Sequence, residues 1–219
     1  KWLNSRYPNG IWKDKNHDWR EGTYKNYFWM VPHNLKSLID TIGGNKFAEQ
    51  RLDSLFVRLD AEYEEDWFAA GNEPDFQVPW IYNWIKKPEK TSKTIKRILD
   101  EMYSSNVDGL PGNDDLGTMG SWYVFASVGL YPLIPGIGGF SLNIPQFNSV
   151  DITLPKNKIL KIRKTGSENY FINSLKFKNI PHYSTWISWD KIKEGGLLIF
   201  DVSSENNSEW FINNPPSYN

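Results

Sequence analysis

The sequence predicts an α+β protein in which helices come first and antiparallel β-strands come second. Before residue 132, apolar side chains recur at helical spacing between polar loops. Pro132 and Pro135 then end the helical pattern. From Gly136 onward, short alternating or β-branched runs follow one another at close intervals, with turn residues between them. We therefore expect two parts, residues 1–135 and residues 136–219, that meet near residue 135.

The first part is expected to consist of helices joined in pairs by polar loops. Residues 1–20 show no sustained period and predict irregular structure. Asn34 and Gly43-Gly44 mark the start and the end of the first helix. The predicted helices cover residues 35–42, 46–63, 78–85, 91–105 and 115–130. Paired helices with such loops are typical of helical toroids, in which the loops at one end form the site.

The second part is expected to form antiparallel strands and to finish in an extended tail. The predicted strands cover residues 140–144, 149–154, 159–163, 170–177, 185–188 and 197–202. Turn residues such as Pro155-Lys156-Asn157 and Gly195-Gly196 separate them. The tail begins at Asn206 and contains Asn213-Asn214-Pro215-Pro216.

Composition excludes several classes of function. The net charge of -1 gives no electrostatic footprint for nucleic acid. No run of residues reaches the length of a transmembrane span, so no membrane span is expected. Cysteine is absent, which excludes disulfides and thiolate chemistry. The 11 Trp, 11 Tyr and 12 Phe often adjoin polar residues, which suits carbohydrate binding, although a helical core rich in large side chains explains the same composition.

One polar turn stands out for its adjacent carboxylates. Asn113, Asp114 and Asp115 follow a turn with two glycines and a proline, and they precede a strongly apolar helix. A single aspartate there fits a helix N-cap. Two adjacent carboxylates are more than a cap needs, and they are costly to desolvate unless another group balances or uses them.

Two more polar loops precede helices, and together the three suggest a catalytic chemistry. Glu21 lies in one of them, and Glu73 lies in the turn formed by residues 71–77. A carboxylic acid on one loop and a carboxylate on another are the minimum equipment for glycoside hydrolysis. Each residue also has a plainer interpretation: Glu21 fits a first-turn acid that balances Arg20, and Glu73 fits an ordinary turn residue.

Several motifs resemble glycoside hydrolase family 92, the calcium-dependent, inverting exo-α-mannosidases. They are Gly-Asn-Glu-Pro at 71–74, Val-Pro-Trp-Ile-Tyr-Asn at 78–83, Asp-Gly-Leu-Pro-Gly-Asn-Asp-Asp at 108–115 and Ser-Trp-Tyr-Val-Phe at 121–125. Upstream, Glu21-Gly22 and Val31-Pro32-His33 are similar to a family segment, as is Trp186-Ile187-Ser188 downstream. The resemblance runs from about Gly10 to Trp210.

The resemblance implies a fold and a set of site residues. The chain would be the C-terminal portion of such an enzyme, with the later helices of an (α/α)6 barrel followed by strands of a sandwich. Glu21 matches the general acid, and Asp115, with Asp114 beside it, matches the general base. Glu73 matches a residue that contacts the leaving-group sugar. Asn72 stands where family members vary with linkage preference.

The resemblance also implies a calcium ion, partners and a location. Gln77 through its side chain and Phe76 through its carbonyl would be ligands, because calcium takes oxygen ligands only. The substrate would be a mannose-containing glycan, and the partner would be the remaining N-terminal part of the same enzyme, outside the cytoplasm of a bacterium. The chain begins at Lys1 rather than Met, which also suggests a fragment. Three segments depart from the family pattern. Thr23-Tyr24-Lys25-Asn26 replaces the commoner Asn-Ala-Trp-Gln, so Asn26 stands where Gln is usual. Asp75-Phe76 replaces a small residue and His, and Trp189 stands where His is usual.

Two functions remain open from the sequence. The first is an exo-acting α-mannosidase, with α-1,2 linkages favoured, that inverts the anomeric centre. The second is a non-catalytic module that binds carbohydrate or serves only the structure. The positions of Glu21 and Asp115 discriminate between them, because hydrolysis requires both carboxyl groups to face one cleft. No zinc-type histidine spacing is present, and Ser121 lacks the context of a serine hydrolase.

Overall fold

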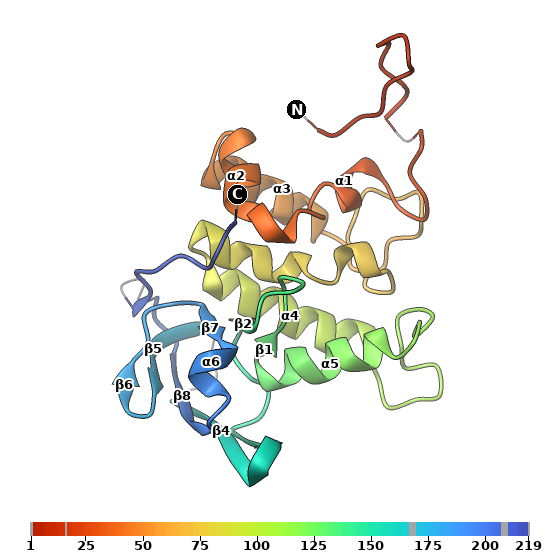
Figure 1. Cartoon of the computed structure of the whole chain (residues 1–219). Helices are drawn as coiled ribbons and strands as arrows, with labels where there is room; N and C mark the ends of the chain where they lie inside the picture. Colours follow the sequence, from red (N-terminus) through yellow and green to blue (C-terminus); the bar gives the residue numbers. More distant parts are fainter. Residues whose placement is uncertain (1, 16, 167–169, 207–209, 219) are drawn as a thin grey trace.

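A computed structural model of the chain describes residues 2–15, 17–166, 170–206 and 210–218. Helices occupy the first part of the chain and strands the second, as Figure 1 shows. The predicted α+β order is therefore confirmed. The helical region contains α1 (Tyr24–Tyr27), α2 (Leu35–Thr41), α3 (Asn45–Leu55), α4 (Pro88–Met102) and α5 (Thr118–Val128), with the short 3-10 helices η1 (Pro32–Asn34), η2 (Glu73–Asp75) and η3 (Val78–Ile85) between them.

The strand region forms two sheets. The three-stranded sheet has the order β1-β2-β7, and the five-stranded sheet has the order β3-β4-β8-β5-β6. Their bounds are β1 (Leu130–Tyr131), β2 (Gly139–Leu142), β3 (Ser149–Leu154), β4 (Lys158–Gly166), β5 (Phe171–Phe177), β6 (Ile180–Pro181), β7 (Trp186–Ser188) and β8 (Gly196–Ser203), with the short helix α6 (Trp189–Ile192) after β7. One pairing differs from the prediction, because β4 and β8 run parallel. A parallel pair needs a long connection, and here β5, β6 and β7 lie between the two strands in the chain.

The helix boundaries follow local signals, with three exceptions. The Asn34 side chain accepts a hydrogen bond from the Ser37 N–H and caps α2, as predicted. The helix predicted to reach residue 63 is wrong in length, because α3 ends at Leu55, whose carbonyl then accepts from the returning Phe68 N–H. Helix α4 starts earlier than predicted, because Pro88 occupies its first turn, where its missing N–H costs nothing. Helix α5 starts later than predicted, at Thr118.

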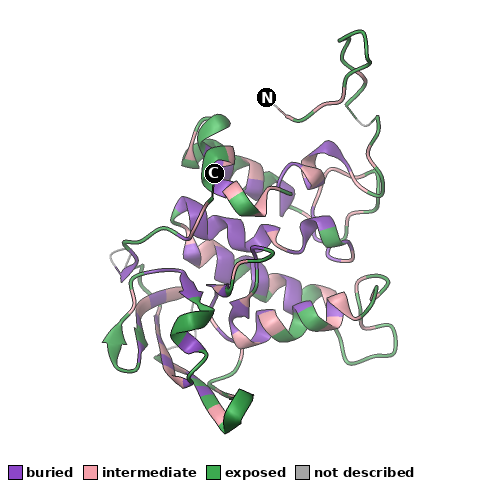
Figure 2. Ribbon diagram, viewed as in Figure 1, coloured by how far each residue is buried: buried purple, intermediate pink, exposed green. Residues whose placement is uncertain are grey.

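Buried side chains form one core in each region, and Figure 2 shows the buried residues concentrated in the middle of the helical region. The helical core contains Trp29, Trp80 and Ile81, each fully inaccessible to solvent. The strand core contains Leu198 and Phe200, which are equally inaccessible. Burial of this much apolar surface is the main stabilising contribution to both regions.

Buried hydrogen bonds join the two regions. Trp80 Nε1 donates to Asn143 Oδ1 at 3.0 Å. Asn83 Nδ2 donates to Ser141 Oγ and to the Leu142 carbonyl, both at 2.9 Å. Helix η3 is thereby fixed to β2 and to the segment that follows it.

The C-terminal tail returns from the strand region to the helices, where its end lies near α2 in Figure 1. Trp84 Nε1 donates to the Pro216 carbonyl at 3.0 Å, and the Tyr218 N–H donates to the His33 carbonyl at 2.7 Å. The extended tail predicted from the sequence thus packs across both regions.

Candidate active site

A cavity of about 350 Å³ lies where four loops of the helical region meet, the three predicted polar loops and residues 59–63. Glu21 comes from the loop before α1, Asn72 and Glu73 come from the turn at η2, and Asn113 and Asp115 come from the loop before α5. All five residues line the same cavity. Loops that are far apart in the chain therefore bring Glu21 and Asp115, two of the three catalytic candidates, and both substrate-binding candidates to one place.

The second and third loops touch through their backbones at two glycines. A Cβ atom on Gly71 would lie 2.6 Å from the Pro111 carbonyl oxygen, and one on Gly112 would lie 3.0 Å from the Gly71 carbonyl oxygen. No larger residue fits either position without displacement of backbone. This close approach places the Glu73 turn directly against the loop that carries Asp115.

Glu21 and Asp115 both have left-handed backbone conformations. The φ angle is 52° at Glu21 and 32° at Asp115. Such angles cost a residue with a Cβ on the order of 1–3 kcal/mol, and they persist only where the surroundings impose them. Residues of this kind cluster at functional sites, which is consistent with the chemistry suggested by the sequence.

The two adjacent aspartates have different surroundings. Asp114 Oδ1 accepts from the N–H groups of Met119 and Gly120, at 3.1 and 3.0 Å, and so caps the start of α5. Asp115 is exposed and lines the cavity, whereas Asp114 is not among the described residues that line it. The helix-capping interpretation therefore describes Asp114, and Asp115 is the aspartate of the pair that lines the cavity.

The Glu21 carboxylate is half exposed. Its side chain retains 48% of its accessible surface, and Oε1 lies 3.5 Å from Arg20 Nε. The carbonyl of Glu21 accepts a short hydrogen bond from Asn72 Nδ2, which ties the first loop to the second. Burial raises the pKa of nearby Tyr27, and the negative charge of Glu21 raises it further.

Asp75, the last residue of η2, is completely buried behind the cavity. Its Oδ2 accepts from the Ala69 N–H and from Asn26 Nδ2, both at 2.8 Å. Oδ1 has no hydrogen-bond partner among the described residues. Burial raises the pKa of this carboxyl to about 7, although the two hydrogen bonds oppose the shift. Asn26 and Asp75, two of the positions expected from the sequence to depart from the family pattern, contact each other directly.

Each of the two predicted calcium ligands makes a hydrogen bond within the chain. The Phe76 carbonyl accepts from Trp122 Nε1 at 2.9 Å, and Gln77 Nε2 donates to the Pro74 carbonyl at 3.0 Å. Calcium requires six to eight oxygen ligands. The described part of the chain holds no cluster of three or more His, Cys, Asp or Glu side chains suited to a metal ion. These residues alone therefore do not fit a calcium site.

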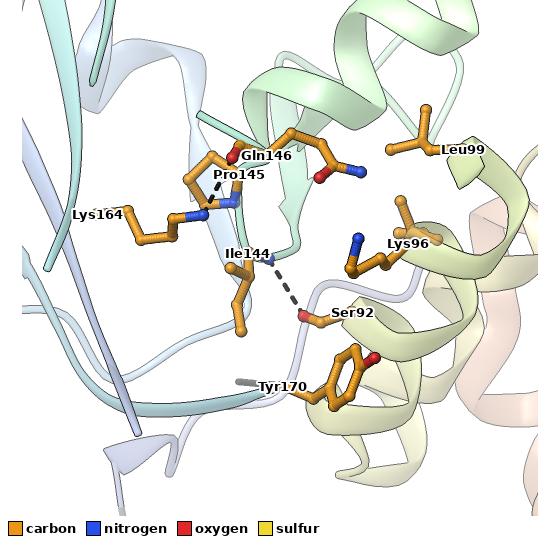
Figure 3. A pocket seen from close by; sticks show the side chains of 9 residues that line it. Ser92, Lys96, Leu99, Ile144, Pro145, Gln146, Lys164 and Tyr170 are labelled. Atoms are coloured by element: carbon orange, nitrogen blue, oxygen red, sulfur yellow. Dashed lines mark hydrogen bonds between the residues drawn. The ribbon is translucent and has the colours of Figure 1, made fainter. Parts of the chain in front are cut away.

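A second cavity, of about 290 Å³, lies where α4 faces the strand region. Figure 3 shows Lys96 and Lys164 on opposite sides of it, with Gln146 and Tyr170 nearby. Lys164 Nζ donates to the Gln146 carbonyl at 3.0 Å, and Lys96 pairs with Asp100. No carboxylate is among the described residues that line this cavity, so it lacks the groups that acid–base hydrolysis needs.

Sequence reasoning identified the residues around the first cavity but missed two supporting features. It gave no role to Asp75, although an aspartate next to the Gly-Asn-Glu-Pro motif was visible. It also did not predict that Gly71 and Gly112 touch. A glycine in each of two polar turns is a weak signal, because most such glycines serve only their own turn.

Comparison with known proteins gives the class of protein to which this fold and cavity belong. Residues 1–204 match the catalytic domain of glycosyl hydrolase family 92. The match covers nearly the whole sequence, and the chain belongs to this family.

Individual relatives agree with this assignment. A family 92 α-mannosidase from Bacteroides thetaiotaomicron superimposes with a TM-score of 0.88 at 28% identity, over 99% of this chain and 31% of that one. A family 92 inverting mannosidase from the same organism, at 24% identity, shares the fold with a TM-score of 0.86, over 99% of this chain and 33% of that one. An uncharacterized secreted glycosidase from Arthroderma benhamiae is 28% identical over 208 residues, which are 92% of this chain and 24% of the fungal protein. The chain thus spans a quarter to a third of the length of these relatives.

None of the helices in the described ranges combines the length and the apolar character needed to cross a membrane.

Proposed function

We propose that this chain carries the acid and base of an exo-acting α-mannosidase that removes terminal mannose from glycans with inversion. The observation that supports the proposal most is that Glu21 and Asp115, from separate loops, line one cavity. Asn72 and Glu73 line the same cavity, and they offer an amide and a carboxylate for sugar hydroxyls. The structural relatives named as α-mannosidases support the choice of sugar.

In this proposal Glu21 is the general acid. Its carboxyl proton passes to the glycosidic oxygen as the bond from that oxygen to the anomeric carbon breaks, and the leaving sugar departs with a hydroxyl group. Asn72 fixes the main chain of Glu21 through the Glu21 carbonyl and so limits where the acid can lie.

Asp115 is the general base in the same step. It removes a proton from a water molecule that attacks the anomeric carbon from the face opposite the leaving group, which inverts the centre. Asp114 supports Asp115 indirectly, because its contacts with Met119 and Gly120 anchor the end of the loop to α5. The Gly71–Gly112 contact holds this loop against the Glu73 turn.

The linkage, the location and the partner are part of the proposal. We propose α-1,2-linked mannose as substrate, with Glu73 in contact with the leaving-group sugar and Asn72 contributing to linkage preference. The secreted fungal relative supports a location outside the cytoplasm, which we propose to be the periplasm or surface of a bacterium. The partner is the N-terminal remainder of the same enzyme. Helix α5 is apolar on most sides and leaves Tyr123 and Val124 exposed. In this proposal, helices of the N-terminal remainder cover that exposed face.

Calcium is proposed from the family resemblance alone, and no step is assigned to it. If this chain contributes ligands, they are Gln77 and the Phe76 carbonyl, with the remaining oxygens supplied from outside the described residues. Calorimetric titration of the chelator-treated complete protein with Ca²⁺ tests this, and absence of a binding isotherm contradicts it.

The function is tested with the complete protein and the mannobioses linked α-1,2, α-1,3 and α-1,6. We expect release of mannose, fastest from the α-1,2 disaccharide, with β-mannose as the first product in ¹H NMR spectra recorded during hydrolysis. First release of α-mannose contradicts the inverting mechanism. If mannose binds but no mannoside is hydrolysed, the chain is a carbohydrate-binding module instead.

A further inference from the structure

Asp75 occupies an unusual position for a charged residue. It is completely buried, yet it lies only two residues after Glu73 and does not line the cavity itself. Buried carboxyl groups are rare unless specific partners hold them. Its partners are Ala69, just before the Gly71 turn, and Asn26, on α1.

Asn26 uses its complete hydrogen-bonding capacity to connect Asp75 to the Glu21 loop. Its Nδ2 group donates to Asp75 Oδ2 and to the Trp67 carbonyl, both at 2.8 Å. Its Oδ1 accepts from the N–H and from the hydroxyl of Thr23, both at 2.9 Å. A side-chain amide has two donors and one acceptor oxygen with two lone pairs, so every position is filled. Asn26 and Thr23 are also buried, which leaves no water to replace a lost partner.

This network ends two residues from Glu21. Thr23 caps α1, and the strained Glu21 directly precedes Gly22 and Thr23 in the chain. On the other side, Asn72 holds the Glu21 carbonyl, and the Asp75 N–H donates to the Asn72 carbonyl at 3.1 Å. The Glu21 segment is therefore tied to η2 at two points, and Asp75 takes part in both.

We propose that Asp75 is a positioning residue that, through Asn26 and Thr23, holds the Glu21 loop against the Asn72–Glu73 turn. Its carboxylate oxygen is the acceptor that orients the Asn26 amide, and the oriented amide fixes the left-handed backbone that directs Glu21 toward the cavity. This positioning role goes beyond the proposed function. It rests on that function in one respect, namely that Glu21 is the general acid.

The test compares two substrates in the complete protein. An α-mannobiose has a basic leaving group that needs a proton from the acid, whereas a dinitrophenyl α-mannoside has a leaving group that departs without one. Replacement of Asp75 by alanine removes the acceptor, so we expect kcat on the mannobiose to fall by about 10- to 100-fold, as misplacement of a catalytic group does. We expect KM to change little and kcat on the dinitrophenyl substrate to be largely retained, and Glu21→Gln to show the same pattern.

Three further variants separate positioning from general loss of structure. Asp75→Asn keeps an acceptor oxygen for Asn26 and Ala69, so we expect it to retain most activity on the mannobiose. Asn26→Ala removes the connecting amide and should behave like Asp75→Ala. Asp66→Asn is the matched control, because Asp66 contacts α1 through Lys25 at 2.9 Å but lies outside the path to Thr23. Equal losses on both substrates in Asp75→Ala, or the same pattern in Asp66→Asn, overturn the proposal.

Amide hydrogen exchange, which does not depend on catalytic activity, distinguishes the positioning role of Asp75 from the proposed function. In Asp75→Ala, the amide hydrogens of Thr23 and Ala69 should exchange with solvent faster than in the unchanged protein, and in Asp66→Asn they should not. If the unchanged protein hydrolyses neither mannoside, the proposed function is wrong, while faster exchange still supports the positioning role. Unchanged exchange in Asp75→Ala overturns the positioning role, whatever the activity of that variant. If Asp75→Ala does not fold, the same exchange measurement in Asn26→Ala decides whether the positioning role holds.

Discussion

The five-stranded sheet and the loops around the cavity differ in the polarity of the side chains that they bury. No polar or charged side chain among the described residues of β3, β4, β5, β6 and β8 is fully buried, and the interior there is apolar. In the loops around the cavity, Thr23, Asn26, Asn72 and Asp75 are all buried, and hydrogen bonds connect them. Polar groups taken out of water contribute little net stability, but they define geometry. The comparison indicates that the five-stranded sheet is built mainly for stability and the loops around the cavity for precise placement of side chains.

The largest expected effect separates activity from stability. Asp115→Asn in the complete protein should lower kcat by about 10²- to 10⁴-fold, because the proposed base can no longer accept a proton. Its free energy of unfolding should change by less than about 0.5 kcal/mol, since Asp115 is exposed. Kinetic assays and urea denaturation measure the two quantities. Asp108→Asn, in the same loop but outside the described lining of the cavity, is the control. Turnover close to that of the unchanged protein in Asp115→Asn would falsify the assignment.

A core substitution in the strand region should show the opposite pattern. Phe200 is fully buried between Lys164 of β4 and Leu175 of β5 in the sheet register. Phe200→Ala should lower the free energy of unfolding by about 3–5 kcal/mol through lost burial and a cavity. The activity per folded molecule should be unchanged. Phe147→Ala, at an exposed aromatic side chain, should leave the denaturation midpoint nearly unaltered. If Phe200→Ala alters KM while the protein stays folded, the two regions are less separate in role than the comparison indicates.

A substitution at the contact between two loops should lower activity through placement alone. Gly71→Ala forces the Cβ against the Pro111 carbonyl oxygen, so the Glu73 turn must move away from the Asp115 loop. A shift of this kind is expected to lower kcat/KM by up to about 10²-fold. Gly120→Ala is the control, because its Cβ would meet Asp114 Oδ1 at an ordinary 3.9 Å, and alanine favours a helix. Unaltered kinetics in Gly71→Ala would show that the loop contact does not set the geometry of the site.

The smallest expected effect is a pH dependence in the strand region. His182 Nε2 donates to the Trp186 carbonyl at 2.9 Å, and His182 Nδ1 accepts from Lys191 Nζ at 2.9 Å. Burial lowers the pKa of His182, and the charge of Lys191 lowers it further. The unfolded chain therefore binds this proton more readily than the folded one, so stability is lost as pH falls through the unfolded pKa of about 6.5 toward the lower folded value. Urea denaturation at pH 7.5, 6.5 and 5.5 should show a steeper decline in the unchanged protein than in His182→Gln, and equal declines contradict this role.

The sequence predicts those parts of the structure whose cause is local. Asn34 and Gly43-Gly44 delimit α2 because capping depends on residues within one turn. The parallel pairing of β4 with β8 was not predicted, because distant segments leave no local signal of their relative direction. The helix predicted to reach residue 63 ends at Leu55, since the chain turns back to let Phe68 pack in the core.

The same distinction between local and distant causes applies to the candidate site. The chemical types of Glu21, Asp115, Asn72 and Glu73 were evident from their motifs, and the structure brings all four to one cavity. The buried connection from Asp75 to Thr23 was not evident, because it depends on side chains that are 49 and 3 residues apart in the chain. Only the fold reveals which of several polar residues is enclosed.

The hydrogen bonds from Trp80 and Asn83 to Asn143 and Ser141 bear on how the molecule unfolds. If the strand region opened first, these buried donors of η3 would lose their acceptors in the middle of the helical core. The change from helix to strand, which falls between α5 and β1, is thus not a point at which the chain can be divided without loss. We expect the two regions to melt in a single calorimetric transition, and a piece that ends at residue 135 to be unable to reach the native state.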